Sequence, residues 1–149
     1  MSLHRQLQQR AAEGRPIRVG LIGAGKFGSM YLAQLPRTPG VHLAAIADLS
    51  PEAACRNLAR VGWQAEQSQA RSADEAIKLG TTWLTDDWQA VATLPQLDVL
   101  VECTGSPVHA VDHILKAIEH GKHVVNVTVE ADAFCGPLLA RKAAEKGVV

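Results

Sequence analysis

The residues best suited to hold a ligand form a glycine-rich segment near the start of the chain. Gly23, Gly25 and Gly28 follow the spacing G-x-G-x-x-G, and Lys26 and Phe27 stand between the last two glycines. Between a strand and a helix, the first glycine allows a tight turn, the second lets the backbone approach a pyrophosphate, and the third lets the helix pack closely. The helix N-terminus adds free N–H groups and a positive dipole end. We therefore predict that these residues bind the phosphates of a dinucleotide.

An acidic residue lies about twenty residues further on, where the same pattern places the ribose-binding carboxylate. Asp48 follows the apolar run of residues 41–47, so we expect it at the carboxyl end of a second strand. Its charge would repel the extra phosphate of NADP, Leu49 and Ser50 supply no cation, and Arg56 and Arg60 lie further along the next helix. We predict NAD(P) as cofactor, with NAD favoured. The alternative is that the glycines only shape a turn and Asp48 only caps a helix.

A second candidate loop, residues 102–107, follows the buried apolar run of residues 97–101. It belongs at the carboxyl edge of the sheet near the reversal of strand order, where ligands bind in open α/β sheets. Its small residues Thr104 and Gly105 would let a nicotinamide ribose lie against the backbone. Cys103 is interpreted as a small buried residue, because no histidine is fixed beside it by spacing to make it a nucleophile.

Apolar runs alternate with helical patterns along the chain, and strands apolar on both faces are typical of a parallel sheet covered by helices. We predict a doubly wound α/β fold of the Rossmann type. Its last strand or strands are expected to be missing, because Val148 and Val149 would only begin a sixth strand. The predicted strands are residues 17–22, 41–47, 81–85, 97–101 and 123–127. The predicted helices are residues 26–35, 73–79, 88–93 and 137–146, with two more beginning at Pro51 and Pro107 after a serine cap.

Length and composition fit one domain, residues 16–149, preceded by an N-terminal arm, residues 1–15. The chain has 149 residues, 47% hydrophobic and 20% charged, with 15 basic residues balancing 15 acidic ones. Zero net charge gives no electrostatic basis for nucleic-acid binding, and no apolar window is long enough to span a membrane. The arm is expected to be either a weakly docked helix or a frayed leader.

The cysteines and histidines lack the spacing of a metal site or a disulfide framework. His109 and His113 are four residues apart, and we interpret them as a solvated helix face or a local cap. Asp86 and Asp87 are interpreted as the N-cap of the next helix. We therefore predict no metal and a reducing, cytoplasmic setting.

Three segments together carry a family resemblance: residues 19–28, 98–105 and 121–126. They resemble the cofactor domain of homoserine dehydrogenase, in a family that includes deoxyxylulose-phosphate-reductoisomerase-like proteins. They are also similar, more distantly, to the glucose–fructose oxidoreductase and inositol dehydrogenase family. The resemblance implies that Asn126 joins the cofactor-binding residues. It also implies an oxidoreductase that is a homo-oligomer in full-length form, with most of the substrate pocket in a following substrate domain that is expected to be missing from these 149 residues.

The resemblance also has departures. Homoserine dehydrogenases carry an Asn-Lys pair after the fifth strand, whereas residues 126–130 here contain no lysine. Glu130 and Asp132 are the candidates for acid–base chemistry, and helix capping by Asp132 is the alternative. We expect hydride transfer between nicotinamide and a small carbonyl or hydroxy compound. A non-catalytic nucleotide-binding module, such as a redox sensor, is the alternative function.

Overall fold

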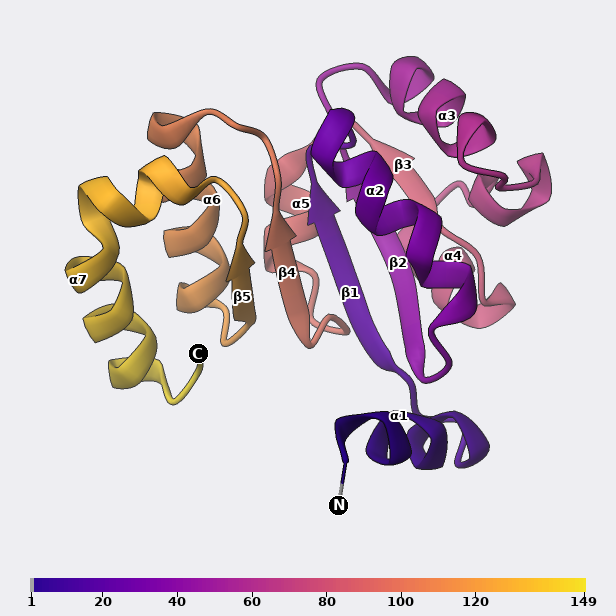
Figure 1. Ribbon diagram of the computed structural model, residues 1–149, viewed down its shortest axis with the longest axis horizontal. Helices are drawn as coiled ribbons and strands as arrows, with labels where there is room; N and C mark the ends of the chain where they lie inside the picture. Colours follow the sequence, from indigo (N-terminus) through magenta and orange to yellow (C-terminus); the bar gives the residue numbers. More distant parts are fainter. Residues whose placement is uncertain (1) are drawn as a thin grey trace.

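Five parallel strands form the sheet, in the order β3-β2-β1-β4-β5 (Figure 1). They are β1 (Ile17–Ile22), β2 (Val41–Ala47), β3 (Trp83–Thr85), β4 (Val99–Glu102) and β5 (His123–Asn126) in a computed structural model that describes residues 2–149. The chain runs outward from β1 to β3, crosses back, and continues outward from β4 on the other side of β1. This reversal beside β1 is the doubly wound topology that the sequence predicts.

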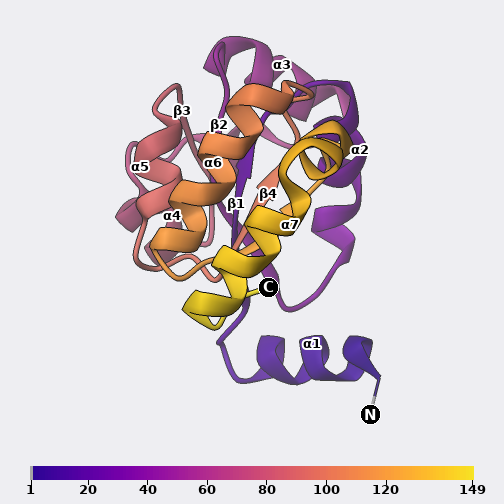
Figure 2. The ribbon, with the colours of Figure 1, turned by 90° about the vertical axis from the view of Figure 1, so that its left-hand side faces the viewer.

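Helices cover both faces of the sheet (Figures 1 and 2). Side chains of α2 and α3 pack on one face, those of α4, α5 and α6 pack on the other, and α7 lies beside α6. The helices are α1 (Leu3–Ala12), α2 (Lys26–Gln34), α3 (Pro51–Arg60), α4 (Ala73–Leu79), α5 (Trp88–Thr93), α6 (Pro107–Glu119) and α7 (Val129–Lys146), with short 3-10 turns at Leu35–Arg37 and Ala65–Ser68.

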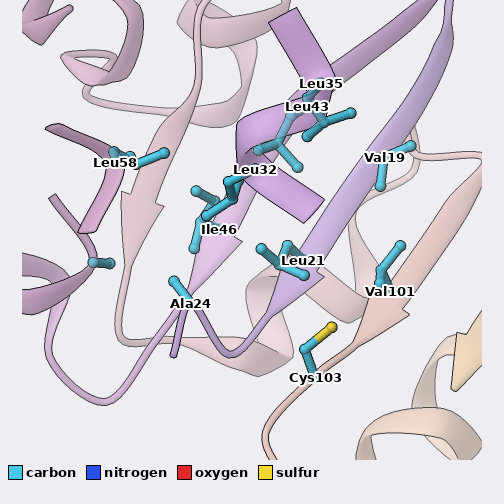
Figure 3. Close-up of a cluster of buried hydrophobic side chains, with 11 residues drawn as sticks. Val19, Leu21, Ala24, Leu32, Leu35, Leu43, Ile46, Leu58, Val101 and Cys103 are labelled. Atoms are coloured by element: carbon cyan, nitrogen blue, oxygen red, sulfur yellow. The ribbon is translucent and has the colours of Figure 1, made fainter. Parts of the chain in front are cut away.

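The core between α2, α3 and the sheet fixes the position of the glycine segment. Leu21 of β1, Ile46 of β2 and Leu32 of α2 are fully buried there, with Leu58 of α3 beside them (Figure 3). Burial of each such side chain contributes roughly 1.5–3 kcal/mol. Because α2 begins directly after the glycines, packing of Leu32 against the sheet holds its N-terminus at the carboxyl end of β1.

Most helix starts follow the predicted caps. The hydroxyls of Ser50 and Ser72 and the carboxylate of Asp87 accept hydrogen bonds from backbone N–H groups in the first turns of their helices. Gly80 ends α4 with φ of 69°. The carboxylate of Glu75, in the first turn of α4, accepts a hydrogen bond of 2.7 Å from the amide of Arg71.

The last helix differs from the prediction, because it begins at Val129 rather than at Pro137, which lies inside it. A proline within a helix costs about 3 kcal/mol, because it removes a backbone hydrogen bond and its ring clashes with the preceding turn. Ala131, Cys135, Leu139 and Ala143 recur every fourth residue and pack against α6 on both sides of the proline. Tertiary burial of this stripe therefore outweighs the local cost.

The predicted sixth strand at Val148–Val149 is not formed as a strand. The carbonyl of Val149 instead accepts a hydrogen bond of 2.7 Å from the amide of Val124, on the outer edge of β5. The edge of the sheet is thus partly covered. Val125 of β5 still leaves 51% of its surface exposed.

The N-terminal arm is a helix, α1, which lies beyond the amino ends of the strands (Figure 1). None of its residues is buried. It touches the domain at Gly40, where an added Cβ would collide with the carbonyl of Leu7. Within residues 2–149, no helix is both long enough and apolar enough to cross a membrane.

Candidate dinucleotide-binding site

Strand register gathers the predicted site residues at one edge of the sheet. Ile22 of β1 pairs with Ala47 of β2 on one side and with Glu102 of β4 on the other. Glu102 pairs in turn with Asn126 of β5. The residues that follow these positions, above all Gly23 and Asp48, therefore emerge side by side at the carboxyl edge.

A different physical reason explains why glycine occupies each of the three positions of the turn. Gly23 has φ of 91°, and a Cβ on it would lie 2.8 Å from the backbone carbonyl of Cys103. A Cβ on Gly28 would lie 2.5 Å from the carbonyl oxygen of Gly23, so only glycine lets α2 approach this closely. Gly25 is different, because its φ of −73° suits any residue and no protein atom lies within 4 Å of an added Cβ. Its glycine keeps open the space in front of the helix.

The N-terminus of α2 faces that open space. No side chain caps this helix end, so its first N–H groups and positive dipole end are available to an anion. Lys26 and Phe27 are exposed in the first turn. A phosphate group fits both the unfilled volume and the unpaired donors.

Asp48 is joined directly to the glycine turn. One carboxylate oxygen accepts a hydrogen bond of 2.8 Å from the amide of Ala24, and the other accepts one of 2.9 Å from the amide of Ser50. Ser50 itself caps α3, so Asp48 is not the cap of that helix. A carboxylate has about four acceptor positions, and two of them remain for ribose hydroxyls.

Beyond β4, the chain turns around a buried carboxylate that the prediction treated only as the start of a loop. Glu102 is fully buried. Its Oε1 accepts hydrogen bonds from the amide of Thr104 at 3.2 Å and from the Thr104 hydroxyl at 2.5 Å, and its Oε2 accepts one from the hydroxyl of Thr128. The Thr128 hydroxyl also accepts a bond of 3.0 Å from the amide of Gly105, whose φ is 69°. The loops after β4 and β5 are therefore held to one carboxylate.

These contacts set the ionisation of Glu102. Burial alone raises the pKa of the carboxyl, but the hydrogen bonds from His113, Thr104 and Thr128 together outweigh it and hold the pKa below its ordinary value. The adjacent Cys103 is buried as predicted, and burial together with the Glu102 charge raises the pKa of its thiol to about 12. This thiol is therefore not an activated nucleophile.

The interpretation of His113 as part of a solvated helix face is wrong. Its side chain is 7% exposed, and Nδ1 lies 3.3 Å from Oε1 of Glu102. Because an ionised carboxylate only accepts, Nδ1 carries the donated proton. The imidazole also packs on Trp88 of α5 with ring centroids 4.5 Å apart. The partner of His109 is Ser106, with Nδ1 and Oγ 2.8 Å apart at the start of α6.

A cleft of about 460 Å³ runs along this edge of the sheet. It connects the glycine turn and Asp48 with Thr104 and the first turns of α5 and α6. It is lined by Ile22, Gly23, Gly25, Ala47, Asp48, Leu49, Asp86, Trp88, Cys103, Thr104, Ser106, His109 and His113. Trp88 and the two histidines were not predicted as site residues, although the four-residue spacing of the histidines and the place of Trp88 at the start of a helix after a strand were visible in the sequence.

Other predicted residues do not line the cleft. The Oδ1 atom of Asn126 is buried without a hydrogen-bond partner, which leaves an acceptor at the end of β5. Glu130 and Asp132 are exposed in the first turn of α7. Neither caps the helix, because Thr128 is the N-cap residue and no side chain makes the cap bond. Among residues 2–149, no group of three or more His, Cys, Asp or Glu side chains is arranged to hold a metal ion.

Fold and site together define a dinucleotide-binding domain of the Rossmann class. The chain belongs to the family described as "Homoserine dehydrogenase, NAD binding domain", whose model matches residues 23–148. Homoserine dehydrogenase of Pseudomonas aeruginosa is 34% identical over 135 residues, which cover 91% of this chain and 28% of the relative. The chain thus spans little more than a quarter of the length of this relative.

Solved structures agree with this assignment. A homoserine dehydrogenase from Thiobacillus denitrificans is similar with a TM-score of 0.63 and 27% identity, covering 89% of this chain and 28% of the other. GenD2 from gentamicin A biosynthesis, solved in complex with NAD, has a TM-score of 0.62 and 22% identity over 90% of this chain and 33% of that one. At that identity the second likeness concerns the fold alone.

Proposed function

We propose that this chain is the cofactor-binding part of an NAD-dependent dehydrogenase that acts on a small carbonyl or hydroxy compound. The observation that carries the proposal is the link between Ala24 and Asp48 beside the open space over Gly25. One structural unit thereby presents a phosphate site and a ribose site at the spacing of a dinucleotide. The homoserine dehydrogenase relatives support the same activity.

The roles of the residues follow from their places. The amides of residues 25–27 bind the pyrophosphate, with the Lys26 and Phe27 side chains exposed beside it, while Gly23 and Gly28 shape the turn. Asp48 binds the hydroxyls of the adenosine ribose. Thr104, Gly105 and Asn126 flank the nicotinamide half. The bound nicotinamide supplies the hydride chemistry, and the protein orients it.

NAD is favoured over NADP because of the charge on Asp48. The nearest cations on the following helix, Arg56 and Arg60, are exposed and do not line the cleft. Calorimetric titration of the chain with NADH and NADPH tests the preference. Tighter binding of NADH supports the role of Asp48, and tenfold tighter binding of NADPH contradicts it.

Turnover is tested on the full-length protein by following NADH absorbance, with NAD⁺ and homoserine, hydroxy acids or sugar derivatives in one direction, and with NADH and aldehydes in the other. Glu130 and Asp132 are the acid–base candidates on this chain, and they stay predictions because both are exposed outside the cleft. The position of Glu130 and Asp132 outside the cleft, together with the absence of lysine at residues 126–130, favours a second candidate function, that of a non-catalytic nucleotide sensor. A nucleotide-sensing module would bind NADH tightly and turn over none of these substrates.

Self-association is also proposed. Val125 of β5 and Val129 and Phe134 of α7 are 51%, 67% and 75% exposed. Apolar groups exposed near a sheet edge favour association with a second surface. Light scattering across a concentration series would show a mass above the monomer, and a monomer at every concentration would contradict the proposal.

A further inference from the structure

Glu102 is the one charged residue among the buried positions of β4. The other buried positions of β4, Leu100 and Val101, are apolar, as expected for a central parallel strand. Burying a carboxylate costs several kcal/mol unless partners compensate it. Glu102 is compensated by neutral donors and one histidine, and no Lys or Arg in residues 2–149 forms an ion pair with it. Its negative charge therefore has no fixed cation beside it.

The hydrogen bonds of Glu102 connect its carboxylate to residues that line the cleft and to the loop after β5. Thr104 and His113 both contact its carboxylate and both line the cleft. Thr128 connects the same carboxylate to the amide of Gly105. One side chain thus separates the charge from the proposed nicotinamide half of the cleft, and Glu102 itself has no exposed surface.

That charge already acts on a neighbouring group. The raised pKa of the Cys103 thiol is caused first by burial and second by the charge of Glu102. The interior around the carboxylate screens weakly, so a charge that affects one neighbour affects others at similar distance.

We propose that Glu102 is a positioning and electrostatic residue that favours binding of oxidised over reduced cofactor. It would do so by placing a buried negative charge behind the loop that holds the nicotinamide. The inference rests on the proposed function. NAD⁺ carries a positive charge on its nicotinamide ring and NADH does not, so a fixed negative charge discriminates between them. The hydrogen bonds to Thr104 and Thr128 hold the loops in place for either form.

The experiment is calorimetric titration of the wild-type chain and Glu102→Gln with NAD⁺, NADH and ADP-ribose, which lacks the nicotinamide. Glutamine keeps the shape and removes the charge. We expect the ratio of NAD⁺ affinity to NADH affinity to fall about fivefold in this variant, and the affinity for ADP-ribose to stay unchanged.

Thr128→Val is the matched variant within the same hydrogen-bond network. It removes one donor to Glu102 and keeps the charge. We expect weaker binding of NAD⁺ and NADH by the same factor, with their ratio unchanged. Asp98→Asn removes a carboxylate from the opposite end of β4, where Asp98 accepts from the amide of Arg18, and should leave the ratio as in wild type.

If Glu102→Gln does not fold, Glu102→Ala tests the same charge, because it removes the carboxylate and leaves the residues that line the cleft unchanged. The same fall in the ratio is expected. An unchanged ratio in the folded variant overturns the inference while leaving cofactor binding established. Failure of the wild-type chain to bind ADP-ribose, NAD⁺ and NADH is a different result, which overturns the proposed function and this inference together.

Discussion

The amide of Ala24 donates a hydrogen bond of 2.8 Å to the carboxylate of Asp48, which joins the turn after β1 to the residue that follows β2. The second carboxylate oxygen of Asp48 holds the amide of Ser50, at the start of α3. One side chain therefore fixes the glycine turn relative to the start of α3. In the proposed function, the negative charge of Asp48 would disfavour a ribose phosphate.

Asp48→Asn should narrow the preference between NADH and NADPH by about tenfold, because it removes the charge that repels the extra phosphate. Asparagine retains one acceptor oxygen, so the turn loses at most one of its two bonds. Titration of both cofactors against the variant measures the change. Asp98→Asn is the control, because it neutralises a carboxylate at the other edge of the sheet. An unchanged preference in Asp48→Asn would show that this charge does not select the cofactor.

Substitution by alanine at Gly25 should lower cofactor affinity, whereas the same substitution at Gly28 should lower the stability of the fold. Gly25→Ala places its methyl group in open space, so the free energy of unfolding should stay within about 0.5 kcal/mol while NADH affinity falls at least about tenfold. Gly28→Ala drives the methyl group against the carbonyl of Gly23. It should destabilise the fold by about 1–3 kcal/mol. Urea unfolding and calorimetry separate the two effects, and equal destabilisation by both changes would contradict the assigned roles.

Acid should weaken the fold through Glu102. Its pKa lies below the ordinary value of 4.5 when folded, so its stabilising contribution is present above the unfolded-state value and is lost as the pH falls through the folded-state value. In urea unfolding, the difference between wild type and Glu102→Gln should be constant from pH 7 to about 4.5 and shrink at lower pH. A difference that stays constant down to pH 3 would contradict the lowered pKa.

The cysteines should differ in reactivity towards a thiol reagent at neutral pH. Cys103 is buried with a pKa of about 12, whereas Cys55 is exposed on α3. We expect the thiol of Cys55 to react rapidly in the folded protein. The thiol of Cys103 should react only after the protein unfolds. Cys55→Ser identifies the fast phase. A fast phase that persists in this variant and disappears in Cys103→Ser would contradict the assignment.

Local patterns were sufficient for much of the scaffold. β1 and β2 have the predicted bounds, and α3, α4, α5 and α6 begin where the caps or prolines predict. These features depend on neighbours within a few residues, such as Ser50 with Ala53. The start of α7 was missed because its decisive contacts, from Ala131 to Ala143 against α6, are made between elements.

The amino-acid sequence by itself determined the fold class, the glycine turn and the place of Asp48, because strand periodicity and glycine spacing depend only on residues close together in the sequence. Only the tertiary structure showed that Glu102, Thr128 and His113 form one buried network. Their association depends on the register of β4 with β5 and on how α6 packs. No short-range pattern encodes these relationships, so the charge beneath the cleft could be recognised only after the strands were paired.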